Sequence, residues 1–386
     1  MTLSRIHRAF AALVLAPGLA LALGSAGART LESGVGDKEI VVGQSLGLTG
    51  PLGELGQDIA NGARAYFDSV NAKGGINGRR IRVVTLDDGY KADNTVKNVE
   101  QMLGEDQVFC LFNIMGTPNS AAILPMVEKT GVPLFSPFTG AQMMREPALP
   151  GVFNIRAGYK DEIEKLVQHL STVGIRRLSV VWQANAFGKE GLANVQAAMA
   201  KRGLTIHSSA SIQTDASDAR AAVAALNRTT PEAVIMITAG KPTFEFIKTY
   251  NKARRGMQFY TLSVMGAQAS IKALGTDGAG VVVASVVPFP WSLANPLANE
   301  YRSAMNEIGQ KQYSFVSFES YINAKTLGEA IRRAGKNPTR AGLVVAAEGM
   351  RNVDLGGFDV GFSKDNHQAS HFVELTIITP DGRFNK

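Results

Sequence analysis

The sequence predicts an α/β protein with two similar lobes, each built from a parallel sheet and covering helices. From Glu39 onward, short runs rich in β-branched and aromatic residues alternate with stretches of helical period. This order favours parallel sheets that are covered on both faces. Residues 108–123 and 233–247 also share one pattern, in which a buried strand is followed by a glycine, one polar residue, a proline and a helix. The repeat, at equivalent points of two series, indicates two lobes of the same kind.

The first series runs from a strand over 39–48 to a strand over 132–136. Its first helix, 58–72, carries apolar residues on one face and is ended by Gly74-Gly75. The apolar face consists of Ile59, Ala63, Tyr66, Phe67 and Val70. The remaining expected elements are a strand over 80–86, a helix over 94–103, a strand over 107–115 and a helix over 119–129.

The second series repeats the alternation and is followed by a different C-terminal part. We expect helices over 161–173, 189–201, 217–227 and 243–253, and strands over 177–183, 204–212, 233–238 and 258–263. The segment 286–292 interrupts this order with two prolines, and helices over 296–309, 315–334 and 339–349 follow. Residues 354–363 and 371–382 have the composition of paired strands. The sequence contains no flexible linker, so short crossings between the lobes predict a hinge and a cleft.

The first 28 residues have the composition of a secretory signal peptide. Arg5 and Arg8 precede an apolar run over 9–23, and Ala26-Gly27-Ala28 is a small-x-small cleavage signal. The run is shorter than the ~20 residues that a membrane-spanning helix needs. We therefore favour a cleaved signal peptide over a membrane anchor and expect an exported mature chain that begins near residue 29.

Charge and cysteine content narrow the class of partner. The formal net charge is +7, with 40 basic and 33 acidic residues and no run of like charges. This distribution does not indicate a nucleic-acid partner and gives only a weak bias toward anionic ligands. Cys110 is the only cysteine, so no internal disulfide is possible, and its apolar surroundings in VFCLF predict a buried, inert thiol.

Three motifs could carry catalysis or bind metal, and each has a simpler explanation. Residues 43–47 match GxSxG around Ser45, but ten residues separate them from the expected helix, whereas a nucleophile elbow turns directly into one. His367 and His371 have i,i+4 spacing, but they fall in a turn that enters a strand, where they lie roughly 13 Å apart. Asp87-Asp88 starts a loop, and its side chains point to opposite faces. We expect no catalytic residue, metal or cofactor.

The junction GTPNS at 116–120 is the strongest candidate for a binding site. Thr117 suits the N-cap of a helix and Pro118 its first position. The free N–H groups behind them, together with the helix dipole, favour an anion. The loop SPFTG at 136–140 follows the next strand on the same edge, where ligands bind in open α/β sheets. At the corresponding edge of the second lobe we expect Trp182, Phe187, Gly240 and Lys241.

At this level of detail, the chain from Glu39 onward resembles the type I periplasmic solute-binding proteins of the leucine/isoleucine/valine-binding group. The resemblance lies in LTGP, in the helix ending NAKGGINGR and the following DD, in the strand–GTPNS–helix unit, in VPLFSPFTG and in VVWQANAFGKEGL. It implies two Rossmann-like lobes that the chain crosses three times, near 155–156, 287–291 and 352–356. Lobe 1 is then 38–155 plus 289–351, and lobe 2 is 156–288 plus 352–386.

The resemblance also implies which residues hold a ligand. Gly116 and Thr117 correspond to a loop that donates to the ligand carboxylate, and the loop Phe138-Thr139-Gly140 supplies a carbonyl and further donors. Phe187 corresponds to an aromatic residue that closes over the ligand. Leu55, Gly240, Lys241 and Met265 complete the predicted ligand-binding set.

The sequence departs from the family pattern at two positions. Thr139 comes one residue earlier than in the leucine-binding pattern. The glutamate that pairs with the ligand α-ammonium has no counterpart, since 263–265 is Ser-Val-Met. Because a buried, unpaired ammonium is costly, we expect a carboxylate with an apolar or aromatic body and no α-amino group. Glu319 or Asp87 could instead pair with an ammonium.

The expected function is capture of an amino acid or a related small apolar or aromatic carboxylate by a monomeric binding protein, which delivers it to the membrane permease of an ABC importer. A ligand sensor for chemotaxis or regulation is one alternative. An exported hydrolase that uses Ser45 is another.

Overall fold

A computed structural model describes residues 31–266 and 268–386, so the predicted signal peptide lies outside the described residues. The first sheet is parallel, with strand order β2-β1-β3-β4-β5. Its strands are β1 (Glu39–Leu46), β2 (Arg80–Asp87), β3 (Cys110–Phe112), β4 (Leu134–Phe135) and β5 (Val152–Phe153). The helices of this part are α1 (Gly53–Ala72), α2 (Ala92–Gly104) and α3 (Thr117–Thr130).

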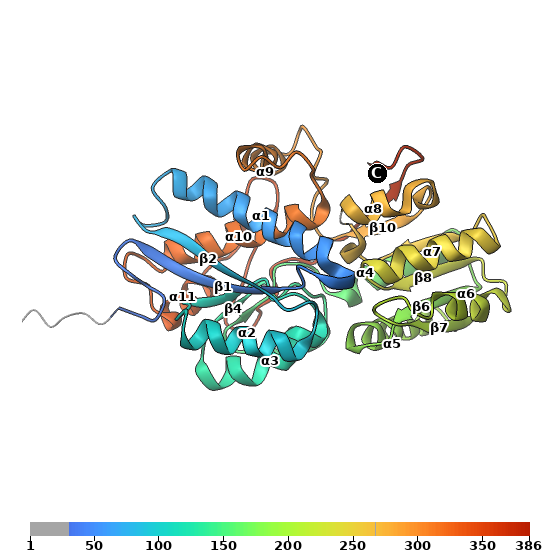
Figure 1. The fold of residues 1–386 in the computed structure, drawn as a ribbon, viewed down its shortest axis with the longest axis horizontal. Coiled ribbons are helices and arrows are strands. Elements are labelled where there is room, and N and C mark those ends of the chain that lie inside the picture. Colours follow the sequence, from blue (N-terminus) through green and yellow to red (C-terminus); the bar gives the residue numbers. More distant parts are fainter. Residues whose placement is uncertain (1–30, 267) are drawn as a thin grey trace, which may run out of the picture. The chain divides into compact units, whose positions relative to one another are not determined.

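Three later helices complete the layers around the first sheet. These are α9 (Pro296–Glu307), α10 (Phe315–Arg333) and α11 (Arg340–Glu348). Figure 1 shows α1 and α10 on one side of the sheet and α2 and α3 on the other. The close approach of α1 and α10 depends on Gly62, because a Cβ there would lie 2.0 Å from the Ser317 carbonyl oxygen.

The second sheet has strand order β14-β13-β10-β9-β8-β6-β7. Its parallel strands are β6 (Leu178–Gln183), β7 (Ser208–Ile212), β8 (Ala233–Ile237), β9 (Gln258–Thr261) and β10 (Val282–Ser285). β13 (Glu374–Ile378) runs antiparallel to β10, and β14 (Phe384–Asn385) antiparallel to β13. The accompanying helices are α4 (Tyr159–Thr172), α5 (Ala186–Ala200), α6 (Ala219–Asn227), α7 (Lys241–Ala253) and α8 (Gln268–Leu274).

Residues 354–363 and 371–382 were expected as paired strands, but they do not pair with each other. β11 (Val353–Asp354) and β12 (Asp359–Val360) form a hairpin of their own. The hairpin contacts elements around the first sheet, because the Leu297 N–H donates to Gly356 O at 2.9 Å and the Phe362 N–H donates to Met350 O. After this hairpin, the chain returns to the second sheet at β13.

Most predicted helices agree with the structure within a few residues, but the strands β5, β10 and β14 and the helix α8 were not predicted. The strand β10 lies just before the proline-rich segment at 286–292, and the seven-residue helix α8 follows β9. Within the described residues, no helix is both long and apolar enough to cross a membrane.

Candidate ligand-binding site

A narrow cavity of about 20 Å³ lies where strands of both sheets end. We call it the inner cavity. Its lining residues are apolar or aromatic and come from both series of elements: Leu52, Leu55, Tyr90, Met115, Gly116, Phe138, Tyr159, Phe187, Ala239 and Val264. This volume is far below the ~300–1,000 Å³ that small-molecule pockets usually have, so a ligand needs the surrounding loops to move apart before it can enter. The apolar lining suits a ligand with an apolar body.

Gly116 is the N-cap of α3 and lines the inner cavity. Thr117 was predicted as this cap, but it is the first helical residue and Pro118 the second. The reason is the backbone of Gly116, whose φ of 96° is open to glycine and strained for other residues. A Cβ on Gly116 would also lie only 2.4 Å from Cε2 of Tyr90. Glycine therefore lets the Tyr90 ring pack directly on the start of the helix.

Two predicted donors meet behind the wall of the inner cavity. The hydroxyl oxygens of Thr117 and Thr139 are 2.7 Å apart, and both residues are almost fully buried. Thr139 Oγ1 also accepts the N–H of Ala141 at 3.1 Å. The Tyr159 side chain hydrogen-bonds Thr139 and the backbone of Gly140, and burial raises the pKa of its phenol. These hydroxyls and N–H groups form one cluster beside the first turn of α3, whose N–H groups have no acceptor within the helix.

A buried ion cluster lies beside this wall. Arg156 donates to Glu162 of α4 at 2.8 Å and lies 3.3 Å from the carboxylate of Glu319 on α10. The Ser263 N–H and hydroxyl donate to Glu162, at 2.8 and 3.0 Å. The three charged side chains are at most 4% exposed. Because Glu162 and Glu319 flank it, this single arginine ties together helices that belong to different sheets.

Burial and the neighbouring charges shift the pKa values of the groups in this cluster. Burial raises the pKa of Glu319 to about 7, although Arg156 acts in the opposite direction. Burial alone would lower the pKa of Arg156, but Glu319 and Glu162 hold it above its ordinary value. The Arg156 guanidinium lies 5.5 Å from the ring centroid of Phe138 and 5.4 Å from that of Tyr159. The positive charge of Arg156 is therefore placed just behind two rings that line the inner cavity.

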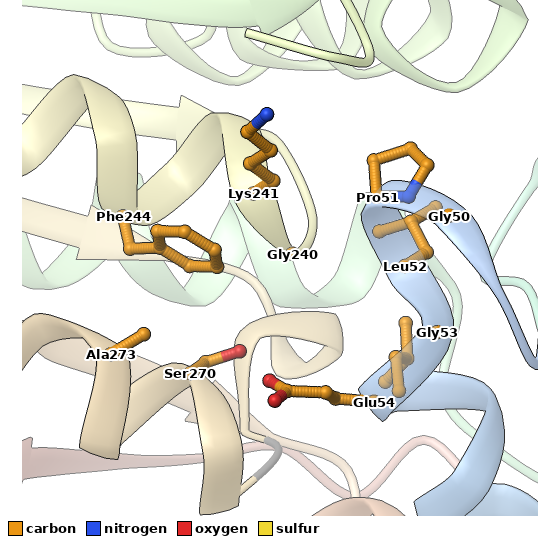
Figure 2. A pocket seen from close by; sticks show the side chains of 11 residues that line it. Gly50, Pro51, Leu52, Gly53, Glu54, Gly240, Lys241, Phe244, Ser270 and Ala273 are labelled. Atoms are coloured by element: carbon orange, nitrogen blue, oxygen red, sulfur yellow. The ribbon is translucent and has the colours of Figure 1, made fainter.

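A second, outer cavity adjoins the first and shares Leu52 and Leu55 with it. It lies between the start of α1, the start of α7 and α8, as Figure 2 shows. Gly240 has a φ of 61°, and a Cβ there would lie 2.4 Å from Cδ2 of Leu52. Glu54, Lys241, Phe244 and Ser270 also line the outer cavity. The outer cavity is therefore more polar than the inner one and separated from it by leucine side chains.

The structure brings the predicted ligand-binding residues together only in part. Those that line the inner cavity are Leu55, Gly116, Phe138 and Phe187, and those that line the outer cavity are Leu55, Gly240 and Lys241. Thr117 and Thr139 lie behind the inner wall, and Gly140 packs against Tyr159, with 2.5 Å between its would-be Cβ and that ring. Met265 is fully buried in the core and lines neither cavity, whereas its neighbour Val264 lines the inner one.

Sequence reasoning missed several side chains of this site. Tyr90 and Tyr159 line the inner cavity, and neither was singled out. Both follow a glycine at the end of a strand or crossing, in DDGY and RAGY, and this is the one signal that could have indicated them. Arg156 and Glu162 gave no signal, because their ion pair and the second pair of Arg156 with the distant Glu319 form only in the folded chain.

The residues considered for catalysis form hydrogen bonds within the protein that hold the local structure. Ser45 donates to Asp88 at 2.7 Å and accepts from Asn98 at 2.9 Å. Asp87 accepts from the Thr49 hydroxyl at 2.6 Å and from the Leu48 N–H at 2.8 Å, which fixes the loop before α1.

The two histidines are also separated. His367 is buried and stacks on Phe153, with ring centroids 4.3 Å apart, whereas His371 is exposed beside Asp161. Among the described residues, no group of three or more His, Cys, Asp or Glu side chains could hold a metal ion.

The chain is similar to known proteins over nearly all of its described length. A family model described as periplasmic binding protein matches residues 39–383. A substrate-binding periplasmic protein from Ralstonia solanacearum is 34% identical with a TM-score of 0.84, covering 90% of this chain and 99% of that one. A possible leucine/isoleucine/valine-binding protein from Rhodopirellula baltica SH 1 is 28% identical with a TM-score of 0.85, covering 91% and 97%.

Curated relatives point to the same group at lower identity. The Leu/Ile/Val-binding protein BraC3 of Rhizobium johnstonii is 26% identical over 160 residues, which are 40% of this chain and 42% of BraC3. The matched part thus spans less than half the length of that relative. Leu/Ile/Val-binding protein homolog 7 of Brucella melitensis biotype 1 is 21% identical over 356 residues, covering 86% of this chain and 88% of the homolog. Together with the two-lobe α/β fold, these matches show that the chain belongs to the periplasmic binding proteins, in the leucine/isoleucine/valine-binding group.

Proposed function

We propose that this chain is the periplasmic substrate-binding component of an ABC importer, and that it captures a small carboxylate with an apolar or aromatic body by hinge closure. The observation that carries the proposal is the lining of the inner cavity. Gly116 and Phe138 belong to loops of the first sheet, whereas Phe187 and Val264 follow strands of the second. A ligand in this cavity contacts both halves and so stabilises them in the closed arrangement. Closure captures the ligand without making or breaking a covalent bond.

The carboxylate end of the ligand is proposed to lie at the start of α3. Thr117 presents its N–H and hydroxyl there, whereas the Gly116 N–H already donates to Phe138 O at 3.2 Å, and the Thr139–Gly140 loop adds donors beside them. A charge-assisted hydrogen bond contributes roughly 1.5–3 kcal/mol. Two or three of them, together with burial of the apolar body, reach the ~8 kcal/mol of a micromolar complex. The hydroxyl pair of Thr117 and Thr139 supports this assignment, since one of the two can turn to donate to an anion.

The body of the ligand is proposed to carry no α-amino group. Two acids could have replaced the missing family glutamate, and both have other partners. Asp87 is hydrogen-bonded to the loop before α1, and Glu319 lies against Arg156 in the ion cluster. Residues 263–265 supply a hydroxyl and two apolar side chains. Among the described residues, no acidic side chain lines the inner cavity, so an ammonium buried there would lack a carboxylate partner, which is costly.

The names of two distant structural neighbours give two classes of ligand that proteins of this fold bind. A branched-chain amino acid ABC transporter protein from Thermus thermophilus, 18% identical with a TM-score of 0.82, has bound valine. A substrate-binding protein from Thermomonospora curvata, 19% identical with a TM-score of 0.82, is described as part of a fatty acid ABC transporter. The second ligand class, a carboxylate without an amino group, is the kind proposed for this chain.

Export and lobe bounds are part of the proposal. Residues 1–28 are proposed to be a signal peptide that directs the chain to the periplasm, where it is proposed to act as a monomer. We propose lobe 1 as 38–155 plus 289–351, and lobe 2 as 156–288 plus 352–386. The contact of Gly356 in the β11–β12 hairpin with Leu297, and that of Phe362 with Met350, favour moving the third crossing to a point after Phe362.

A thermal-shift panel of amino acids, aromatic acids and short organic acids tests the proposal. We expect stabilisation by carboxylates with an apolar body, and a loss of at least tenfold in affinity for Thr117→Val. Wild-type affinity in that variant would contradict the assignment of the carboxylate site. A sensor role would preserve this binding, so the presence of a neighbouring permease gene set distinguishes the importer from the sensor. An exported hydrolase would lose turnover in Ser45→Ala while still binding the ligand.

A further inference from the structure

The first turns of α5 send three side chains toward the loops of the first sheet. Asn185 is the N-cap, where its side chain accepts the N–H of Gly188 and hydrogen-bonds the Tyr90 side chain. Phe187 lines the inner cavity, and its ring centroid lies 4.9 Å from that of Tyr159. Glu190 follows three residues later, on the same face of the helix. This face of α5 is therefore the part of the second sheet's helical layer that meets the ligand loops.

Glu190 makes the most direct polar contact of the three. Its Oε1 accepts the N–H of Gln142 at 2.6 Å. Gln142 starts the short helix Gln142–Met144, which lies between β4 and β5 of the first sheet. The hydrogen bond therefore joins elements of two different sheets. A carboxylate acceptor makes such a bond stronger than a neutral one.

The loop that Glu190 holds is the one that carries the proposed donors. Arg145 donates from Nη2 to Thr139 O at 3.0 Å and from Nη1 to Ala141 O at 2.8 Å. Glu190 is close enough to Arg145 for their charges to attract each other, although burial raises the pKa of the Glu190 carboxyl. Thr139 in turn contacts Thr117 at the start of α3. A continuous chain of polar contacts thus runs from α5 to the carboxylate end of the inner cavity.

We infer that Glu190 is a closure latch: its bond to the Gln142 N–H forms only when α5 lies over the inner cavity, and it therefore prolongs the time for which a captured ligand stays bound. This inference rests on the proposed function, since it takes hinge closure as the binding step. Glu190 is a positioning residue that acts through the 139–142 loop. Its bond is absent from the open form, so its loss weakens the closed form alone.

Glu190→Ala removes the acceptor, and Glu190→Gln restores a neutral one of similar size. Lys189→Ala is the matched control, because it alters an exposed neighbour on the same turn. Closure is measured as a distance distribution between spin labels on Glu128→Cys of α3 and Gln196→Cys of α5, both exposed positions. The single natural cysteine is fully buried, so the labels react at the introduced sites.

The distributions are recorded without ligand and with two probes, isovalerate and 3-phenylpropanoate. In Glu190→Ala we expect the closed-to-open ratio to fall about tenfold or more and the probe dissociation rate to rise by a similar factor. The association rate and the melting temperature of the ligand-free protein should stay at wild-type values, and Glu190→Gln should recover most of the loss.

Equal closed-to-open ratios in wild type and Glu190→Ala, with or without a probe, would overturn the latch. So would an equal loss in Lys189→Ala. Failure of the proposed function gives a different result: neither probe then shifts the wild-type distribution. In that case the latch is still judged from the ligand-free distributions of wild type and Glu190→Ala.

Discussion

Neutralising Glu319 should remove a large part of the pH dependence of stability. Glu319 is 3% exposed, and burial raises its pKa to about 7, against 4.5 for the free group. Because the folded protein holds this proton more tightly than the unfolded chain, stability is highest below the unfolded pKa and falls as pH rises through the folded one. The loss should therefore occur between about pH 4.5 and pH 7.

The magnitude follows from the size of the shift. Between the unfolded and the folded pKa, each pH unit lowers the free energy of unfolding by ~1.36 kcal/mol. A window of about two units, from pH 5 to pH 7, therefore contributes about 2–3 kcal/mol. In Glu319→Gln this contribution should vanish, because the amide does not titrate. Asp58, whose pKa burial raises to about 6, contributes in the same direction in both proteins and cancels in the comparison.

Urea unfolding at pH 5 and pH 8 measures the effect. We expect wild type to lose about 2–3 kcal/mol more than Glu319→Gln between the two conditions. Arg156→Met serves as the opposite perturbation, since it leaves two buried carboxylates without their cation and should cost about 3–5 kcal/mol at pH 8. Equal pH dependence in wild type and Glu319→Gln would refute the reasoning on the ion cluster.

Three further changes test other parts of the structure. Gly62→Ala should lower the free energy of unfolding by several kcal/mol, because its Cβ would lie 2.0 Å from a backbone oxygen of α10. The control Gly104→Ala places its Cβ in open space and should change the free energy of unfolding by less than about 1 kcal/mol. Gly116→Ala should cost about 1–3 kcal/mol from its positive φ and also weaken ligand binding, since the new Cβ meets Tyr90; unchanged affinity would place the ligand elsewhere. Burial raises the pKa of the Cys110 thiol to about 12, so a thiol reagent at pH 8 should leave the folded protein unmodified, and rapid labelling would contradict its burial.

The elements that the sequence predicts well are those with a local signal. The helix expected over 315–334 is observed as Phe315–Arg333, because its boundaries coincide with a capping serine and a break in apolar period. β10 was missed because four buried residues next to a proline-rich stretch have no period to detect. The ion cluster around Arg156 was missed for a different reason: its partners come from α4 and α10, and only the folded chain brings them together.

The site shows the same division. The strand–glycine–helix junctions at Gly116 and Gly240 were predicted from local pattern, and both glycines line a cavity. Thr117 was placed one position too early in the helix, because propensity for the N-cap favours threonine while the positive φ at 116 requires glycine. The approach of Glu190 to Gln142 depends on how elements of the two sheets pack, which no local pattern encodes.

The central claim is that the inner cavity takes a carboxylate without an α-amino group. Calorimetric titration with two matched pairs tests it most directly: isovalerate against L-valine, and 3-phenylpropanoate against L-phenylalanine. Each pair has the same apolar body and differs only in the ammonium. The account predicts micromolar or tighter binding of at least one deamino acid and at least tenfold weaker binding of its amino acid. Tight binding of valine or phenylalanine, with no affinity for either deamino acid, would contradict it.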